Sequence, residues 1–157
     1  MPKKQIYLTG FMGTGKSMIL NCLHEVCGFD KIEMDEQIVQ EQGMSIPEIF
    51  EKKGEEYFRN LETELVKKIS AMDNIVVSCG GGTVMRQCNV DEMKKNGTIV
   101  LLTAEPETVY ERVKGSHNRP LLEKNMNPEY IKELMEARRP KYEAAADFVI
   151  KTDNRTA

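Results

Sequence analysis

The chain has 157 residues, in which 25 acidic side chains slightly outnumber 22 basic ones, so the net charge is only −3. This balance argues against a nucleic-acid partner, which would favour a basic surface, and no apolar run of about 18 residues is present that could cross a membrane. The length suits one domain with one core, and the start Met1-Pro2-Lys3-Lys4 does not resemble a signal peptide, so we expect a cytoplasmic protein.

Five strand-like runs alternate with helical patterns along the chain. The strands are predicted at Gln5–Thr9, Lys31–Asp35, Ile75–Ser78, Thr98–Thr103 and Phe148–Lys151. The helices are predicted near Lys16–Cys27, Ile46–Lys53, Glu55–Ala71, Arg86–Lys95, Pro106–Lys114 and Pro128–Ala146. This alternation indicates an α/β fold in three layers, with a five-stranded parallel sheet between helices. Ligands of such sheets bind beyond the carboxyl ends of the strands.

The first motif is Gly10–Ser17, which reads G-x-x-x-x-G-K-S between the first predicted strand and the first predicted helix. Its glycines let the backbone approach a ligand closely, and the loop N–H groups and the positive end of the helix suit a polyphosphate. Lys16 supplies a charge for the outer phosphates, and Ser17 is placed to bind Mg²⁺. The alternative is a glycine-rich turn followed by a surface lysine.

Two acidic residues, Glu33 and Asp35, follow the second strand pattern. Strand alternation would place both on one side, where they could hold Mg²⁺ through water and accept a proton from a substrate hydroxyl. Equally, Asp35 could simply cap a helix that begins at Glu36. The third strand ends in Ser78, with no aspartate there for a metal, so we expect the metal's carboxylate to come from Glu33 or Asp35.

The helix from Glu55 carries an Arg-x-x-Glu pair, Arg59 and Glu62, whose side chains can meet at a spacing of three. Taken alone, such a pair is more typical of a solvated surface. Apolar residues at helical spacing predict the core-facing stripe, which consists of Phe58, Leu61, Leu65, Ile69 and Met72.

Three consecutive glycines, Gly80–Gly82, follow the third strand. They suggest close approach of a ligand to backbone N–H groups, with a plain flexible turn as the alternative. The neighbouring Cys79 could be reactive, but we favour a small buried apolar role. The four cysteines form no Cys-x-x-Cys pair and only two histidines accompany them, so we expect reduced thiols.

Two arginines in the last third of the chain, Arg119 and Arg138, are candidate ligand-binding residues. The Gly/Ser/Asn-rich stretch before Arg119-Pro120 indicates a mobile loop, and an arginine there could close over a transferring phosphate. Arg138 falls on the apolar stripe of the last helix while Arg139 turns away, so Arg138 needs an anionic partner, either a carboxylate of the protein or a ligand. Pro140 is expected to weaken or kink that helix.

With these residues assembled, the chain resembles the shikimate kinase family from its first strand to its last residues. The motifs that carry the resemblance are Gly10–Ser17, Glu33–Asp35, the stretch from Gly43 through Gly54 to Glu62, Gly80–Gly82, Arg119–Leu122 and Arg138–Tyr142. The resemblance implies a fold of the nucleoside-monophosphate-kinase type and transfer of the ATP γ-phosphate to the 3-hydroxyl of shikimate, a step of chorismate and aromatic amino-acid biosynthesis. It implies a monomeric kinase domain over residues 1–157, with a lid at about 113–125 and a substrate-binding helical segment at about 35–62.

The resemblance also assigns roles to residues. The catalytic residues would be Asp35 as base, Lys16 and Arg119. The ATP site would comprise Gly13, Thr14, Gly15, Lys16, Ser17, Met18, Arg112, Arg119 and Arg155. Shikimate would be held by Asp35, Arg59, Gly80, Gly81, Gly82 and Arg138, and Mg²⁺ by Ser17 and, through water, Glu33.

Two departures and two rivals accompany this interpretation. Glu33 stands where the family usually has aspartate, and the sequence ends with residues 152–157, where the family has an adenine-side loop and a final helix. One rival is another small-molecule kinase, acting on gluconate or a nucleoside monophosphate. The other is a nucleotide-binding switch or inactive relative, although the sequence has no Asn-Lys-x-Asp motif for guanine.

Overall fold

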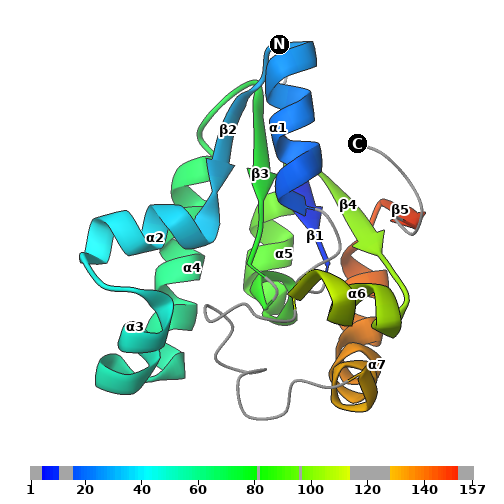
Figure 1. Cartoon of the computed structure of the whole chain (residues 1–157). Helices are drawn as coiled ribbons and strands as arrows, with labels where there is room; N and C mark the ends of the chain where they lie inside the picture. Colours follow the sequence, from blue (N-terminus) through cyan, green and yellow to red (C-terminus); the bar gives the residue numbers. More distant parts are fainter. Residues whose placement is uncertain (1–4, 11–15, 81, 96, 114–127, 152–157) are drawn as a thin grey trace.

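The protein is described by a computed structural model covering residues 5–10, 16–80, 82–95, 97–113 and 128–151. Five parallel strands form one sheet in the order β2-β3-β1-β4-β5 (Figure 1). The strands are β1 (Gln5–Thr9), β2 (Asp30–Glu33), β3 (Ile75–Ser78), β4 (Gly97–Thr103) and β5 (Phe148–Lys151). The predicted fold class is therefore confirmed.

Helices cover both faces of the sheet, which gives the three expected layers. The helices are α1 (Lys16–Cys27), α2 (Met34–Gln42), α3 (Ile46–Lys53), α4 (Glu55–Ile69), α5 (Gln87–Lys94), α6 (Pro106–Val113), α7 (Pro128–Ala145) and the short 3₁₀ helix η1 (Thr83–Met85). Helix α1 packs on one face through a small cluster of Leu8, Leu20 and Val76. The larger cluster on the other face joins Tyr7 and Val77 of the sheet to residues of α4, α5 and α7.

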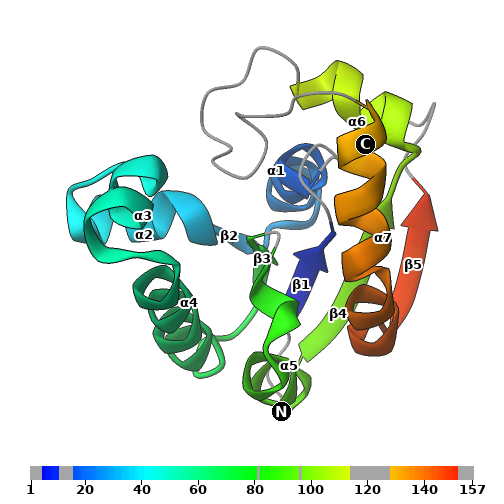
Figure 2. The same ribbon diagram turned by 90° about the horizontal axis from the view of Figure 1, so that it is seen from below.

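Helices α2 and α3 lie beside α4 at one end of the molecule, whereas α6, α7 and β5 lie at the other (Figures 1 and 2). Gly43 ends α2 in the left-handed conformation, and Gly54, with φ of 91°, separates α3 from α4. Helix α3 starts with a capping box, because Ser45 accepts from the Glu48 N–H while the Glu48 side chain accepts from the Ser45 N–H. These local signals fold the segment back so that α4 begins near the carboxyl edge of the sheet.

The opposite end of α4 is fixed by a side chain of the first strand. The Gln5 amide donates to the carbonyls of Ile69, Ser70 and Met72 at 3.2, 2.9 and 2.9 Å, and its oxygen accepts from the Tyr7 hydroxyl at 2.8 Å. Ile69 is the last residue of α4, and Ser70 and Met72 follow it, so Gln5 holds the chain where it leaves this helix. The sheet therefore determines where α4 lies.

Two local predictions were wrong, and a third is not tested. Strand β2 ends at Glu33 and α2 begins at Met34, so Asp35 lies in the first helical turn and is neither at the end of a strand nor a helix cap. Met72 lies beyond α4 and is 39% exposed. Helix α7 continues through Pro140, with Tyr142 and Ala145 buried beyond it, so the expectation that this proline weakens or kinks the helix stays a prediction.

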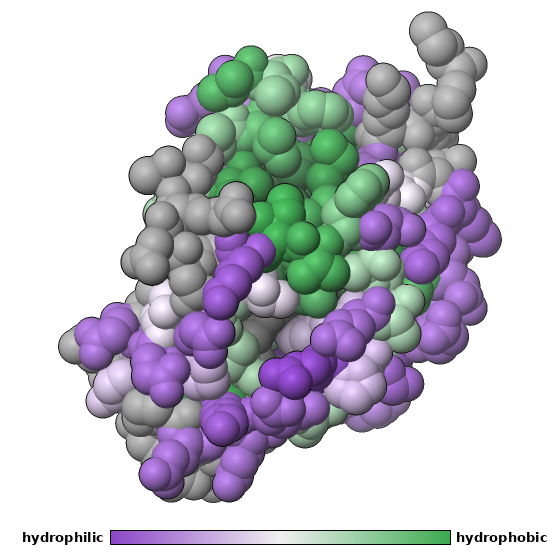
Figure 3. Space-filling model, turned by 90° about the vertical axis from the view of Figure 1, so that its right-hand side faces the viewer, coloured by the Kyte–Doolittle hydropathy of each residue, from purple (hydrophilic) through white to green (hydrophobic). Residues whose placement is uncertain are grey.

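The edge strand β5 is the most exposed strand of the sheet. Its Phe148, Val149 and Ile150 side chains are exposed, and Figure 3 shows apolar side chains gathered on the face that lies at the right of Figure 1. By contrast, β3 is buried throughout, as its apolar pattern predicted. None of the helices in the described ranges combines the length and apolarity needed to cross a bilayer.

Candidate active site

Of the phosphate motif, the structure describes Gly10 and the first residues of α1, Lys16 and Ser17. The Lys16 ammonium donates to the Gly10 carbonyl at 2.7 Å, and the Ser17 hydroxyl donates to the Glu33 carboxylate. Both side chains stand at the positive end of α1, where backbone N–H groups favour anions. Met18, another residue of the predicted ATP site, is 61% exposed on the same turn.

The pairing of Ser17 with Glu33 brings two oxygen ligands together beside the phosphate motif. Mg²⁺ is commonly bound by one or two protein oxygens, with phosphates and water completing its shell. No group of three or more His, Cys, Asp or Glu side chains forms a metal cluster among the described residues. The donor set therefore fits Mg²⁺ held jointly with a phosphate ligand. A hydrogen bond with Glu33 and the charge of Glu33 raise the pKa of Glu36, so this edge is rich in negative charge that a cation would relieve.

Asp35 lies against the glycine segment that follows β3. A Cβ atom on Gly80 would come within 2.9 Å of Asp35 Oδ1 and within 2.7 Å of Glu62 Oε2. Both carboxylates therefore need a glycine at this position. Asp35 is half-buried in the first turn of α2, so the structure brings the predicted base and one predicted glycine into contact.

The guanidinium of Arg59 lies on the same glycine segment. A Cβ atom on Gly82 would come within 2.7 Å of Arg59 Cζ, so Gly82 leaves the room that this side chain occupies. Its Nη1 donates to Glu62 at 2.8 Å, and its Nη2 lies 3.3 Å from Glu55 Oε2. The Phe58 ring lies below, 5.4 Å from Cζ. The arginine side chain is only 15% exposed and is well fixed.

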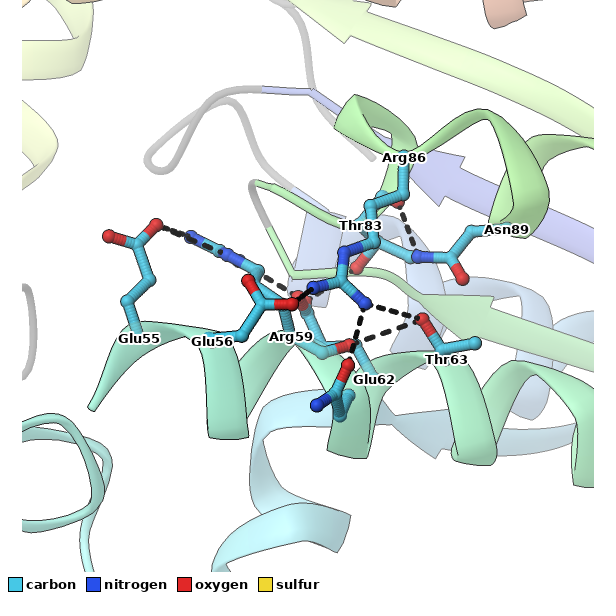
Figure 4. A network of polar contacts seen from close by, with 9 residues as sticks. Glu55, Glu56, Arg59, Glu62, Thr63, Thr83, Arg86 and Asn89 are labelled. Atoms are coloured by element: carbon cyan, nitrogen blue, oxygen red, sulfur yellow. Dashed lines mark hydrogen bonds and ion pairs between the residues drawn. The ribbon is translucent and has the colours of Figure 1, made fainter. Parts of the chain in front are cut away.

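Glu62 is a buried carboxylate and not part of a solvated surface pair, which corrects the simplest interpretation of Arg-x-x-Glu. Its side chain is 1% exposed, and it accepts from Thr83 Oγ1 at 2.8 Å as well as from Arg59 (Figure 4). Burial raises the pKa of Glu62, although Arg59 and Thr83 act in the opposite direction.

The pKa of Arg59 is also raised, because the ion pairs with Glu62 and Glu55 outweigh the effect of burial. The two raised pKa values disagree about the ion pair. The raised pKa of Arg59 favours the charged arginine, whereas the raised pKa of Glu62 favours the neutral carboxyl group. We take Glu62 to be ionised at neutral pH, because two well-placed donors face its two oxygens.

Arg138 is half-buried on α7, whereas Arg139 is exposed and pairs with Glu136, as the helical stripe predicted. Burial raises the pKa of the neighbouring Tyr142, and the charge of Arg138 and a hydrogen bond from it oppose that shift. The charges of Arg59 and Glu62 also act on Tyr142, so this part of α7 faces the same region as the start of α4. Tyr142 therefore lies within electrostatic reach of both predicted carboxylate-binding arginines.

Several predicted site residues lie outside the described part of the chain. They are Gly13, Thr14, Gly15, Gly81, Arg119 and Arg155, together with the side chain of Arg112, whose backbone belongs to α6. Of the lid predicted at about 113–125, only the backbone of residue 113 is described. Cys79 is 2% exposed and burial raises its pKa, which confirms the buried apolar role over a reactive one.

Sequence reasoning missed three groups at this site. Glu55, four residues before Arg59, could have been found from the helical spacing of opposite charges. Glu36 follows Asp35 directly, but its contact with Glu33 depends on where α2 begins. Thr83 is 21 residues from Glu62, and no local pattern connects them.

Comparisons with known proteins agree on one family. A family model described as "SKI: Shikimate kinase" matches residues 12–157. The shikimate kinase of Persephonella marina is 44% identical over 98% of this chain and 92% of its own length. The solved shikimate kinase from Acinetobacter baumannii in complex with shikimate has a TM-score of 0.92 and 32% identity, covering 99% of this chain and 86% of that one. The structure from Aquifex aeolicus has a TM-score of 0.82 and 40% identity, covering 96% and 88%.

Proposed function

This chain belongs to the shikimate kinase family, and from that premise we propose that it transfers the γ-phosphate of ATP to the 3-hydroxyl of shikimate. The observation that supports this most is that a phosphate-binding end and a group of acidic and arginine side chains lie at the same edge of the sheet. Lys16 and Ser17 form a phosphate-binding end, and Asp35 and Arg59 lie on the adjoining glycine segment. A small acid that carries hydroxyl groups suits this arrangement. The product would lead to chorismate and the aromatic amino acids.

At the phosphate end, Lys16 would exchange the Gly10 carbonyl for the phosphate oxygens of ATP, with the N–H groups of residues 13–15 and 18 around them. Ser17 and, through water, Glu33 would hold Mg²⁺. The bound cation would supply neutralisation of the phosphate charge. Glu33, which stands where the family usually has aspartate, accepts a hydrogen bond from Ser17 directly.

At the acceptor end, Asp35 would bind the shikimate hydroxyls and accept the proton of the attacking one. Arg59 and Arg138 would bind the carboxylate, because a planar guanidinium can donate two parallel hydrogen bonds to it. The backbone of Gly80, Gly81 and Gly82 would contact the ring. The helical segment of residues 35–62 supplies Asp35 and Arg59 to this half of the site, within a single domain of residues 1–157.

Catalysis in this proposal is mostly positioning and electrostatic stabilisation. Arg119 would neutralise the transferring phosphoryl group, and Arg112 and Arg155 would lie at the nucleotide. A lid at about 113–125 would close over the reactants and exclude water, so that ATP is not hydrolysed without an acceptor.

The proposal includes a cytoplasmic monomer. Light scattering after size exclusion, over a range of protein concentrations, tests the monomer. A dimer mass at all concentrations would reject it.

The proposed function is tested by ADP release from MgATP in a coupled assay. Shikimate, gluconate, a nucleoside monophosphate or no acceptor is added to the same enzyme preparation. We expect ADP release only when shikimate is the added acceptor. Release with another acceptor would contradict the proposal, as would silence with all of them from folded protein that binds ATP. In that last case Glu33→Asp is the informative variant, because gain of activity would identify Glu33 as the cause of an inactive relative.

A further inference from the structure

We propose that Arg86, a residue outside the assigned site, is a positioning residue that holds the carboxylate-binding Arg59 at its working distance from the glycine segment. The inference rests on the proposed function, because it concerns how this site is held in shape. Arg86 lies between η1 and α5 with an extended backbone (φ −98°, ψ 124°).

The Arg86 guanidinium connects this junction to three residues of α4 (Figure 4). Its Nη2 donates to Glu56 Oε1 at 2.6 Å, and its Nη1 lies 2.9 Å from Asn60 Oδ1 and 3.4 Å from Thr63 Oγ1. These acceptors follow one another at spacings of four and three residues, so they form one stripe along α4. A single side chain thus spans two turns of that helix.

A second connection runs inside the protein and parallel to the first. Thr83 donates to the buried Glu62 at 2.8 Å, and its carbonyl accepts from Asn89 of α5 at 2.8 Å. The segment from Gly82 to Asn89 is therefore tied to α4 at a buried point and at a half-exposed point. Arg59 projects from α4 between these two ties and lies on Gly82.

The two ties differ in what they can contribute. The inner one fixes a buried ion pair and is part of the core. The outer one joins Arg86, whose side chain is 26% exposed, to Glu56, which is 82% exposed. Such an ion pair adds little to stability. The Arg86 guanidinium, with its three acceptors, nevertheless restricts rotation and sliding of α4 relative to the glycine segment. The position of Arg59 against the substrate carboxylate would depend on this restriction.

The test compares steady-state kinetics of the wild type, Arg86→Gln and Arg139→Gln at saturating MgATP. Arg139→Gln is the control, because it removes an exposed arginine whose ion pair with Glu136 lies within α7 and does not involve α4. For Arg86→Gln we expect the KM for shikimate to rise about tenfold, less than the about 100-fold that a 1 Å misplacement can cost. The kcat and the KM for ATP should stay within about twofold of the wild type, since Arg86 touches neither the phosphate end nor Asp35. The control should match the wild type.

A double mutant separates positioning from a general structural effect. If Arg86 acts through Arg59, then adding Arg86→Gln to Arg59→Lys should raise the KM for shikimate by less than twofold. Fully multiplicative effects would overturn the inference, as would an unchanged KM in the single variant. If Arg86→Gln does not fold, Glu56→Gln combined with Asn60→Ala removes two of its acceptors from exposed positions and should reproduce the KM effect. A wild type without shikimate-dependent activity would instead refute the proposed function, and this inference with it.

Discussion

We predict that, in the proposed site, Glu55 competes with the substrate carboxylate for Arg59, so that removal of Glu55 tightens shikimate binding. Glu55 Oε2 lies 3.3 Å from Nη2 and 3.4 Å from Nε of Arg59, so it occupies one edge of the guanidinium. Glu62 holds Nη1. A bidentate carboxylate ligand needs such an edge, and Glu55 has to leave before shikimate can take it. We therefore predict that Glu55→Gln lowers the KM for shikimate.

The size of the effect follows from the exposure of the pair. Glu55 is 57% exposed and its contact distances are long, so the pair belongs with solvated ion pairs. Such pairs contribute about 0.2–1 kcal/mol, which corresponds to a KM lower by a factor of about 1.4 to 5. The kcat should not change, because Glu55 contacts no group of the proposed phosphoryl-transfer site. The effect should shrink at high salt, where exposed charges are screened.

The assay is steady-state kinetics with varied shikimate at saturating MgATP, at low and high ionic strength. Glu64→Gln is the control, since it removes an exposed glutamate of the same helix that pairs with Lys67 at 3.6 Å and not with Arg59. A higher KM in Glu55→Gln, with the control unchanged, would refute the competition argument. It would mean that Glu55 orients Arg59 for the ligand.

Three further predictions concern the glycine segment and the buried carboxylate. Gly80→Ala should lower kcat, because the added Cβ must displace the Asp35 and Glu62 carboxylates at a cost of about 1–3 kcal/mol. An unchanged rate of phosphoryl transfer in single-turnover experiments would place Asp35 outside the chemistry. Gly82→Ala should mainly raise the KM for shikimate, since its Cβ displaces the Arg59 guanidinium, and titration calorimetry with shikimate should show the same weakening. The raised pKa of Glu62 means that the folded state holds this proton more tightly, so its contribution to stability is present below the unfolded value of 4.5 and is lost as pH rises through the folded value. The free energy of unfolding of the wild type minus that of Glu62→Gln, from urea titrations at several pH values, should therefore fall over that window, and a rise would contradict the direction of the shift.

The sheet and the phosphate motif could be predicted because their signals are local. A run such as Ile75–Val77 is apolar at every position, which fits a strand that is covered on both faces, and all of β3 is indeed buried. The phosphate motif has a fixed spacing between a strand and a helix. Each signal needs no knowledge of distant residues.

The boundary between β2 and α2 could not be located in the same way. The sequence Glu33–Asp35 suits the end of a strand or the start of a helix, and alternation along a strand was the wrong periodicity for it. The helix begins at Met34, whose side chain is fully buried. Asp35 therefore reaches Gly80 from the first turn of a helix and not from a strand.

The burial of Glu62 also depended on tertiary structure. An arginine and a glutamate three residues apart on a helix look the same in sequence whether they face water or the core. What decides the matter is Thr83, which donates to Glu62 from another element, and the absence of side chains at Gly80 and Gly82. The arginine sites were thus suggested by the sequence, and their support was supplied by the fold.

The most direct test of the central claim identifies the product. Wild-type protein is incubated with MgATP and shikimate, and ³¹P and ¹H NMR of the product establish which hydroxyl carries phosphate. The account predicts phosphate on the 3-hydroxyl, with one ADP formed for each ester. Phosphate on another hydroxyl, or ADP formed without any phosphorylated shikimate, would contradict it.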